Sequence, residues 1–238
     1  MATIADNLQA VRERIAHAAR AAGREAEKIT LLAVSKTHPA QRVIEAVAAG
    51  QRTFGENYVQ EAVRKMDAVA AASDPGIALE WHLIGPLQSN KTRTVAERFD
   101  WVQTIDREKI AARLSAQRAD TRAPLNVLVQ VNVSGEASKS GVAPESVLAL
   151  AQAVARLPRL RLRGLMTIPE PTDDVALQRA RFRRLRELLE AARASGLALD
   201  TLSMGMSDDM EAAIAEGATM VRIGTAIFGA REIERGIA

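Results

Sequence analysis

The sequence predicts an α/β fold, a single (β/α)8 TIM-like barrel with an extra N-terminal helix, and three observations predict it. Eight short apolar stretches of strand length alternate along the chain with stretches of helical periodicity. The 238 residues fit the size of one such barrel, about 250 residues. No linker rich in Pro, Gly or Ser divides the chain, so residues 1–238 are expected to form one domain. A doubly wound sheet is the alternative for the same alternation.

The expected elements follow one another in strict alternation. A first helix over 3–22 has apolar residues at helical spacing, an N-cap at Thr3 and a stop at Gly23. Apolar stretches predict strands over 30–35, 52–55, 80–84, 101–105, 125–133, 160–168, 201–205 and 220–227. Between them, helical patterns are predicted near 39–49, 57–72, 89–98, 107–119, 144–156, 174–195 and 207–216.

The composition excludes or disfavours several classes of function. Hydrophobic residues make up 47% of the chain, enough for a large core. The absence of cysteine excludes disulfides and thiolate chemistry, and only three histidines argue against a histidine-rich metal site. Aromatic residues at 3% and interspersed charges, 32 basic against 29 acidic, argue against nucleic-acid binding. No stretch resembles a signal peptide or a membrane span, so we expect a cytoplasmic protein.

Lys36 closes the first predicted strand. It follows the run Thr30-Leu31-Leu32-Ala33-Val34-Ser35, and a turn at Thr37-His38-Pro39 comes next. In a (β/α)8 barrel the carboxyl ends of the strands carry the chemistry. A desolvated lysine has a lowered pKa and attacks carbonyls, so Lys36 is a candidate for Schiff-base formation with an aldehyde. The alternative is a lysine that reaches solvent or pairs with a carboxylate.

The last predicted strand runs into a glycine turn. Alternation places Arg222 and Gly224 on one face of the strand, opposite two branched apolar residues. If the branched pair packs against helices, Arg222 points into the barrel mouth. The backbone at Gly224-Thr225 allows a phosphate to approach closely, and barrels often bind phosphate after strands seven and eight. A tight turn with a structural arginine is the alternative.

Strand seven offers a second half for the same phosphate site. Ser203 shares a strand face with Gly205, and we expect the two to complete a phosphate cup. Ser207 is expected to cap the following helix instead, with Asp208 and Asp209 in the first helical turn.

Weaker signals come from four other residues. Asn57 could bind a ligand or cap the next helix, and Tyr58 is the only tyrosine in the chain. His82 lies in an apolar strand, where a core histidine is the more common case. Lys139 lies in a polar loop after strand five and is either a second amine near the mouth or a solvated loop lysine.

Together these residues describe one kind of ligand. A lysine ends strand one, a phosphate cup lies at strands seven and eight, and an arginine lies between them. An aldehyde that also carries a phosphate would use all three. Pyridoxal 5′-phosphate is such a molecule, and so are many phosphosugars.

At this point the sequence resembles a known family, the pyridoxal phosphate homeostasis proteins, also called the YggS-like or proline synthase co-transcribed family. The similarity runs from about residue 4 to residue 230, with the motifs in order and compatibly spaced. The motifs are Ala33-Val34-Ser35-Lys36-Thr37, Phe54-Gly55-Glu56-Asn57-Tyr58, Trp81-His82-Leu83-Ile84-Gly85 with Leu87-Gln88-Ser89-Asn90-Lys91, Gly164-Leu165-Met166, Ser203-Met204-Gly205-Met206-Ser207 and Arg222-Ile223-Gly224-Thr225.

The resemblance implies a barrel like the N-terminal domain of alanine racemase that binds pyridoxal 5′-phosphate. By position it makes Lys36 the Schiff-base lysine, Asn57 a residue that lines the cofactor, and Arg222 the partner of the pyridine nitrogen. The phosphate would be held by Ser203, Gly224 and Thr225. Lys139 matches a lysine suggested as a secondary amine site in the family.

The resemblance also implies a role in holding the cofactor or delivering it to pyridoxal phosphate-dependent enzymes, with no assigned catalytic activity. An arginine only donates hydrogen bonds, so Arg222 would leave the ring nitrogen unprotonated and weaken carbanion stabilisation. Racemisation remains an alternative, but it needs a proton donor on each face of the substrate carbon. Full-length racemases take one from an added domain, which we expect to be absent here, and this favours a monomer. A Schiff-base aldolase acting on a phosphosugar is the third reading.

Overall fold

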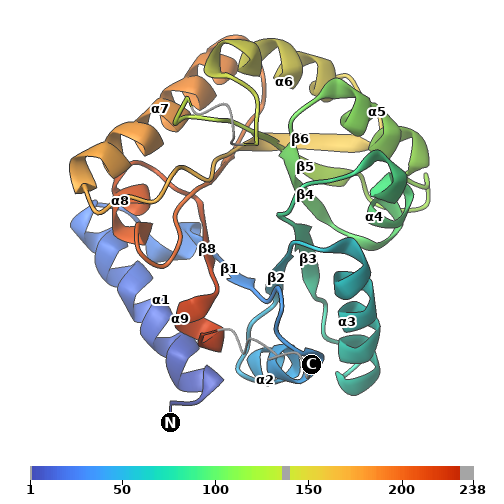
Figure 1. Ribbon diagram of the computed structural model, residues 1–238, viewed down its shortest axis with the longest axis vertical. Helices are drawn as coiled ribbons and strands as arrows, with labels where there is room; N and C mark the ends of the chain where they lie inside the picture. Colours follow the sequence, from blue (N-terminus) through green and yellow to red (C-terminus); the bar gives the residue numbers. More distant parts are fainter. Residues whose placement is uncertain (1, 136–139, 231–238) are drawn as a thin grey trace, which may run out of the picture.

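Eight parallel strands close into a barrel in the computed structural model, which describes residues 2–135 and 140–230 (Figure 1). The strands pair in chain order, and the last one returns to pair with the first. They are β1 (Thr30–Val34), β2 (Thr53–Glu56), β3 (Glu80–Leu83), β4 (Trp101–Ile105), β5 (Leu125–Gln130), β6 (Leu160–Met166), β7 (Thr201–Ser203) and β8 (Met220–Ile223). The (β/α)8 barrel predicted from the sequence is therefore confirmed.

The helices form an outer ring around the strands (Figure 1). They are α1 (Ile4–Ala21), α2 (Ala40–Ala48), α3 (Val59–Ala72), α4 (Thr92–Arg98), α5 (Glu108–Gln117), α6 (Val147–Ala155), α7 (Val175–Ala194), α8 (Met210–Ala215) and α9 (Thr225–Phe228), with short 3₁₀ turns at Ala26–Lys28, Ser89–Lys91 and Pro144–Ser146. None of the helices in the described ranges is long and apolar enough to cross a membrane.

The predicted N-terminal helix is present as α1. Thr3 caps it with a reciprocal pair of hydrogen bonds: its hydroxyl accepts from the Asp6 N–H at 3.1 Å, and its own N–H donates to the Asp6 carboxylate at 2.9 Å. One face of the helix buries Ile4, Leu8, Val11 and Ile15. In Figure 1 this helix covers the outside of the barrel where β8 meets β1. The closing seam of the barrel is therefore shielded by the first segment of the chain.

The main hydrophobic core lies between the strands and the helices, and the space inside the barrel is filled differently. The interior holds two small apolar clusters, one of Leu32, Val34, Ile84 and Met220 and one of Trp101, Leu128 and Met166. Buried polar side chains lie beside them, including those of His82, Gln103, Ser203 and Arg222. The inside of the barrel is thus unusually polar for a packed core.

Two sequence predictions about the last strands are wrong. Strand β8 ends at Ile223 and does not continue to residue 227, because the chain turns at Gly224 into the short helix α9. Strand β7 ends at Ser203, and α8 begins at Met210 after Asp209, so Ser207 does not cap it. A run of apolar residues shows burial, but it does not separate a buried strand from a buried helical turn.

A carboxylate at the C-terminal end of α8 joins this helix to α7. The side chain of Glu216 is 2% exposed, and its carboxylate forms ion pairs with Arg179 at 2.8 Å, Arg183 at 3.1 Å and Arg186 at 3.2 Å. Burial acts to raise the pKa of Glu216, but the hydrogen bonds from Arg183 and Arg179 outweigh it, so the pKa lies below its ordinary value. A carboxylate with a lowered pKa in the folded state stabilises the fold above its unfolded pKa and loses that contribution as the pH falls.

We therefore expect Glu216→Gln to lower the free energy of unfolding by about 1–2 kcal/mol at pH 7. The difference between wild type and variant should shrink as the pH falls below about 4. Urea unfolding at several pH values measures both effects. Glu187→Gln is the control, because Glu187 is half exposed on α7 and pairs with Arg184 only at 3.8 Å. A pH-independent difference for Glu216→Gln would contradict this assignment.

Candidate functional site

A cavity of about 520 Å³ opens at the carboxyl end of the strands. This volume lies within the range of about 300–1,000 Å³ that is typical of small-molecule sites. Five of the six residues predicted to bind a ligand line it: Lys36, Asn57, Arg222, Gly224 and Thr225. They come from the ends of β1, β2 and β8, so sequence-distant strand ends meet at one mouth as the fold predicts.

Lys36 follows β1 and lines this cavity, and the residues on either side of it are held in place by burial and hydrogen bonding. Ser35 before it is fully buried, and Thr37 after it adopts a left-handed backbone conformation with φ of 66°. Non-glycine residues adopt this conformation rarely and at an energetic cost. The Thr37 N–H donates to the Glu61 carboxylate at 2.7 Å, which holds the turn in place. The lysine is therefore presented by a turn that the surrounding structure enforces.

Lys65 and Glu56 form a buried ion pair directly behind this turn. The Lys65 Nζ donates to the Glu56 carboxylate at 2.6 Å, the Ser35 carbonyl at 2.7 Å and the Glu61 carboxylate at 3.0 Å. The side chains of Lys65 and Glu56 are 3% and 0% exposed. Burial raises the pKa of Glu56, and the charge and hydrogen bond of Lys65 oppose the rise only in part. This cluster ties α3 to the ends of β1 and β2.

Arg222 is buried beneath the cavity and lines its floor. Its Nη1 donates to the Ser203 hydroxyl at 2.8 Å, and its Nη2 donates to the Thr167 carbonyl at 2.7 Å. Burial lowers the pKa of Arg222 to about 10, so the guanidinium stays charged at neutral pH. The side chain lies as the strand alternation predicts, with its branched neighbours Val221 and Ile223 in the outer core. A fixed cation therefore faces any ligand in the cavity.

Ser203 is not among the residues that line this cavity, so its role in holding a phosphate stays a prediction. Its side chain is fully buried, and its hydroxyl donates to Gln103 at 2.6 Å while accepting from Arg222. The strand alternation correctly points Ser203 into the barrel, where its side chain is shielded from solvent. Ser207, in the connection between β7 and α8, lines the cavity.

Gly224 and Thr225 form the wall next to Lys36. A Cβ added at Gly224 would lie 3.1 Å from the Val34 carbonyl oxygen, which is tighter than most such contacts, so glycine favours this close approach of the turn to β1. The first N–H groups of a helix have no partner within the helix, and α9 begins at Thr225. An acceptor-rich ligand group can therefore contact both the backbone and the Thr225 hydroxyl here.

Two further charged residues line the cavity, and neither was predicted from the sequence to bind a ligand. Arg14 of α1 is one of them, and its guanidinium also donates to the Ser207 carbonyl at 3.1 Å and pairs with Glu211 at 2.8 Å. Asp208 is the acidic residue of the lining. Arg14 belongs to an amphipathic helix of ordinary composition, so no sequence signal marked it. Its cation adds to those of Lys36 and Arg222 and makes the lining suited to an anion.

Two other candidate residues lie elsewhere, and a third is not described by the structure. Tyr58 is 58% exposed and does not line the cavity. His82 is fully buried in β3 and hydrogen bonded through both ring nitrogens, as expected for a core histidine. Lys139 lies outside the described residues.

Comparison of the sequence with known proteins finds matches over nearly the whole chain. The family model for the N-terminal domain of alanine racemase matches residues 7–232. The pyridoxal phosphate homeostasis protein of Pseudomonas aeruginosa is 62% identical over 232 residues, which are 98% of this chain and 97% of that protein.

Two solved structures show the same barrel. PipY of Synechococcus elongatus, solved with pyridoxal phosphate bound, is 36% identical with a TM-score of 0.81, and the match covers 95% of this chain and all of PipY. Alanine racemase of Corynebacterium glutamicum is 19% identical with a TM-score of 0.66, and the match covers 96% of this chain but 63% of the racemase. The chain therefore belongs to the pyridoxal phosphate homeostasis protein family, which is built on the N-terminal domain of alanine racemase.

Proposed function

We propose that this protein binds pyridoxal 5′-phosphate as a Schiff base with Lys36 and serves the storage or delivery of the cofactor. The observation that carries the proposal is the shared cavity of Lys36, Arg222 and the Gly224-Thr225 backbone. This is the set of groups that an aldehyde, a ring nitrogen and a phosphate on one molecule require. The names of the relatives, one solved with this cofactor, support the same ligand.

Each group of the lining has a part in holding the cofactor. The amine of Lys36 would bond the aldehyde carbon with loss of water, and the Gly224-Thr225 backbone with the Thr225 and Ser207 hydroxyls would hold the phosphate. Asn57 lines the same cavity and would lie beside the ring. Arg222 would donate a hydrogen bond to the ring nitrogen. The cation of Arg14 adds attraction for the phosphate dianion.

The same residues favour holding the cofactor over turnover. Bound pyridoxal phosphate supplies an electron sink, which is strong only when its ring nitrogen is protonated. Arg222 cannot accept that proton, because it is charged and only donates. Lys36 can serve one face of a substrate carbon, whereas Tyr58, the only tyrosine in the sequence, is not among the residues that line the cavity. We infer that amino-acid racemisation is not the main role.

A spectrum of the purified protein with pyridoxal 5′-phosphate tests the proposal. We expect a yellow absorbance band that borohydride removes, with the reduced adduct mapped to Lys36 by mass spectrometry of peptides. A colourless protein that turns over a phosphosugar would overturn the proposal in favour of an aldolase. Loss of optical activity from an amino acid, at a rate well above that of free cofactor, would favour the racemase.

Three narrower statements stay predictions of the same proposal. We expect a monomer, a cytoplasmic location, and transfer of the cofactor to recipient pyridoxal phosphate-dependent enzymes. The match with the relative from Pseudomonas aeruginosa covers nearly all of both chains, but it identifies no recipient enzyme.

A further inference from the structure

A chain of hydrogen bonds crosses the interior of the barrel from one mouth to the other. It begins at Arg222, passes through Ser203, Gln103 and His82, and ends at Glu80. Its four heavy-atom distances are 2.8, 2.6, 2.8 and 2.9 Å. The three middle residues are fully buried, whereas the side chain of Glu80 is 41% exposed.

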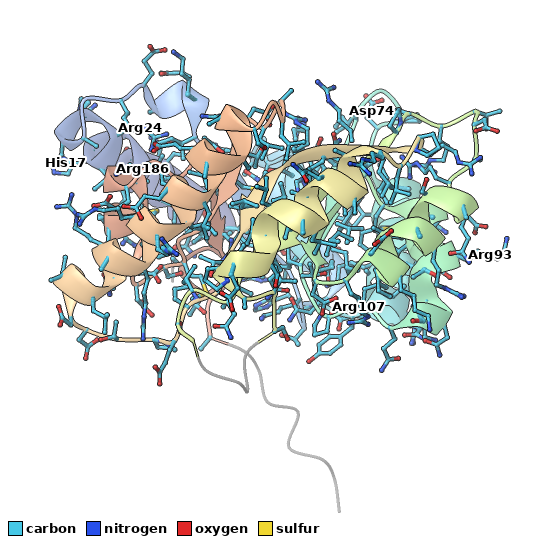
Figure 2. All side chains as sticks on the ribbon, turned by 90° about the horizontal axis from the view of Figure 1, so that it is seen from above. His17, Arg24, Asp74, Arg93, Arg107 and Arg186 are labelled. Atoms are coloured by element: carbon cyan, nitrogen blue, oxygen red, sulfur yellow. The ribbon has the colours of Figure 1, made fainter. Side chains whose placement is uncertain are left out.

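The two ends of the chain lie at opposite mouths. Arg222 lines the cavity that holds Lys36, and Glu80 lines a second cavity of about 280 Å³. Glu80 is the first residue of β3, so this second cavity lies at the amino ends of the strands. Figure 2 shows these two ends of the barrel: Arg24 and Asp74 mark loops that precede strands, and Arg107 marks a loop that follows one.

The chemistry of the end groups sets the direction of every hydrogen bond in the chain. A guanidinium only donates, and a carboxylate only accepts. Arg222 therefore donates to the Ser203 oxygen, the Ser203 O–H donates to Gln103 Oε1, and Gln103 Nε2 donates to His82 Nδ1. His82 is left with its proton on Nε2, which donates to Glu80.

The surroundings of His82 favour this neutral tautomer. Burial lowers the pKa of His82 below its ordinary value, although Glu80 opposes the change. The ring stacks on Trp101, with centroids 5.0 Å apart and planes within 8°, and the Arg163 guanidinium lies 4.9 Å from the Trp101 ring centroid. Stacking on Trp101 therefore fixes the orientation of the imidazole ring, and its two nitrogens point toward Gln103 and Glu80.

We propose that Glu80 and Gln103 are positioning residues for Arg222. These two residues fix the direction of the hydrogen bonds, so that a lone pair of the Ser203 hydroxyl points toward Arg222. The guanidinium is thereby held in the orientation that meets the ring nitrogen of the cofactor. The proposal rests on the proposed function, because the ring nitrogen belongs to pyridoxal phosphate. It makes the far mouth of the barrel part of the recognition of the ring, without any contact between Glu80 and the ligand.

Glu80→Ala and Glu80→Gln separate this role from a structural one. Alanine removes the terminal acceptor and allows His82 to move its proton to Nδ1, which reverses Gln103 and takes the Ser203 O–H out of the chain. Glutamine keeps an oxygen acceptor and should keep the chain. The control is Glu25→Ala, which removes a carboxylate that pairs with Lys28 of the same second cavity.

Binding of two probes reports on Arg222. For Glu80→Ala we expect the affinity for pyridoxal 5′-phosphate to fall by about threefold, and for the buried Gln103→Met by about tenfold. The affinity for inorganic phosphate should stay within about twofold in both, because phosphate does not use the ring contact. Glu80→Gln and Glu25→Ala should bind both probes as the wild type does. Gln103→Met removes a fully buried polar group and can therefore fail to fold. In that case Glu80→Ala alone tests the proposal.

Histidine ¹⁵N NMR of the ligand-free protein gives a readout that needs no cofactor. We expect His82 as the Nε2–H tautomer in the wild type and in Glu80→Gln, and a detectable Nδ1–H population in Glu80→Ala. Unchanged tautomer and unchanged binding in Glu80→Ala would overturn the inference. If instead the wild type fails to form the borohydride-reducible adduct at Lys36, the proposed function fails, whatever the tautomer of His82.

Discussion

Lys36→Ala is expected to abolish the yellow band and the borohydride-trapped adduct completely. The variant lacks the amine that bonds the aldehyde, and no contact of the cavity can replace a covalent bond. The phosphate contacts at Gly224-Thr225 remain, so reversible binding of the cofactor should persist with lower affinity. Absorbance, borohydride labelling and equilibrium dialysis measure the three effects.

Two further variants sharpen this test. Lys36→Arg keeps a positive charge but offers no nucleophilic amine, so it should also lose the adduct. Lys28→Ala removes a largely exposed lysine near the opposite mouth and should keep the wild-type spectrum. A band of wild-type intensity in Lys36→Ala would contradict the assignment, and the peptide that carries the label would show whether Lys139 acts as a second amine.

Lys65→Met is expected to destabilise the folded protein by about 3–5 kcal/mol at neutral pH. The substitution leaves the Glu56 carboxylate fully buried without its cation. Burial already raises the pKa of Glu56, and without Lys65 that pKa rises further. A carboxyl group with a raised pKa in the folded state loses stability as the pH rises. The destabilisation should therefore be small near pH 4.5 and largest above pH 7.

Urea unfolding across this pH range measures the effect. The double variant Lys65→Met/Glu56→Gln should recover part of the loss and should lack the pH dependence, because no buried carboxylate remains. Lys28→Met breaks an exposed pair and is expected to change the free energy of unfolding by no more than about 0.5 kcal/mol. A loss that is equal at all pH values would show that packing, and not the buried charge, accounts for the cost.

Much of the fold follows from local pattern, because parallel strands buried on both faces leave uninterrupted apolar runs. The run before Lys36 is the clearest case, and strand alternation correctly placed both Lys36 and Arg222 toward the interior. The boundaries near the end of the chain failed for a physical reason. The sequence after Ile223 stays largely apolar, as in a strand, and only the structure shows that the chain turns at Gly224 into α9.

Strand alternation predicted that Ser203 and Arg222 point into the barrel, but it gives no measure of depth along the barrel axis. Ser203 is the last residue of β7, whereas Ser207 lies in the connection that follows this strand. In the structure Ser203 is fully buried and hydrogen bonded to Arg222, and Ser207 lines the cavity. Arg14 could not be found from its own segment, because it reaches the site only through the packing of α1 on α8.

The pairing of β1 with β8 has a consequence for the order of events in biosynthesis. The amine comes from the first strand and the phosphate wall from the turn after the last one, and the two meet only when these strands pair. A ribosome must therefore release nearly the whole chain before a binding site exists. Ligand binding therefore requires the closed barrel. Because a barrel opened between β1 and β8 cannot bind the ligand, binding stabilises the closed form.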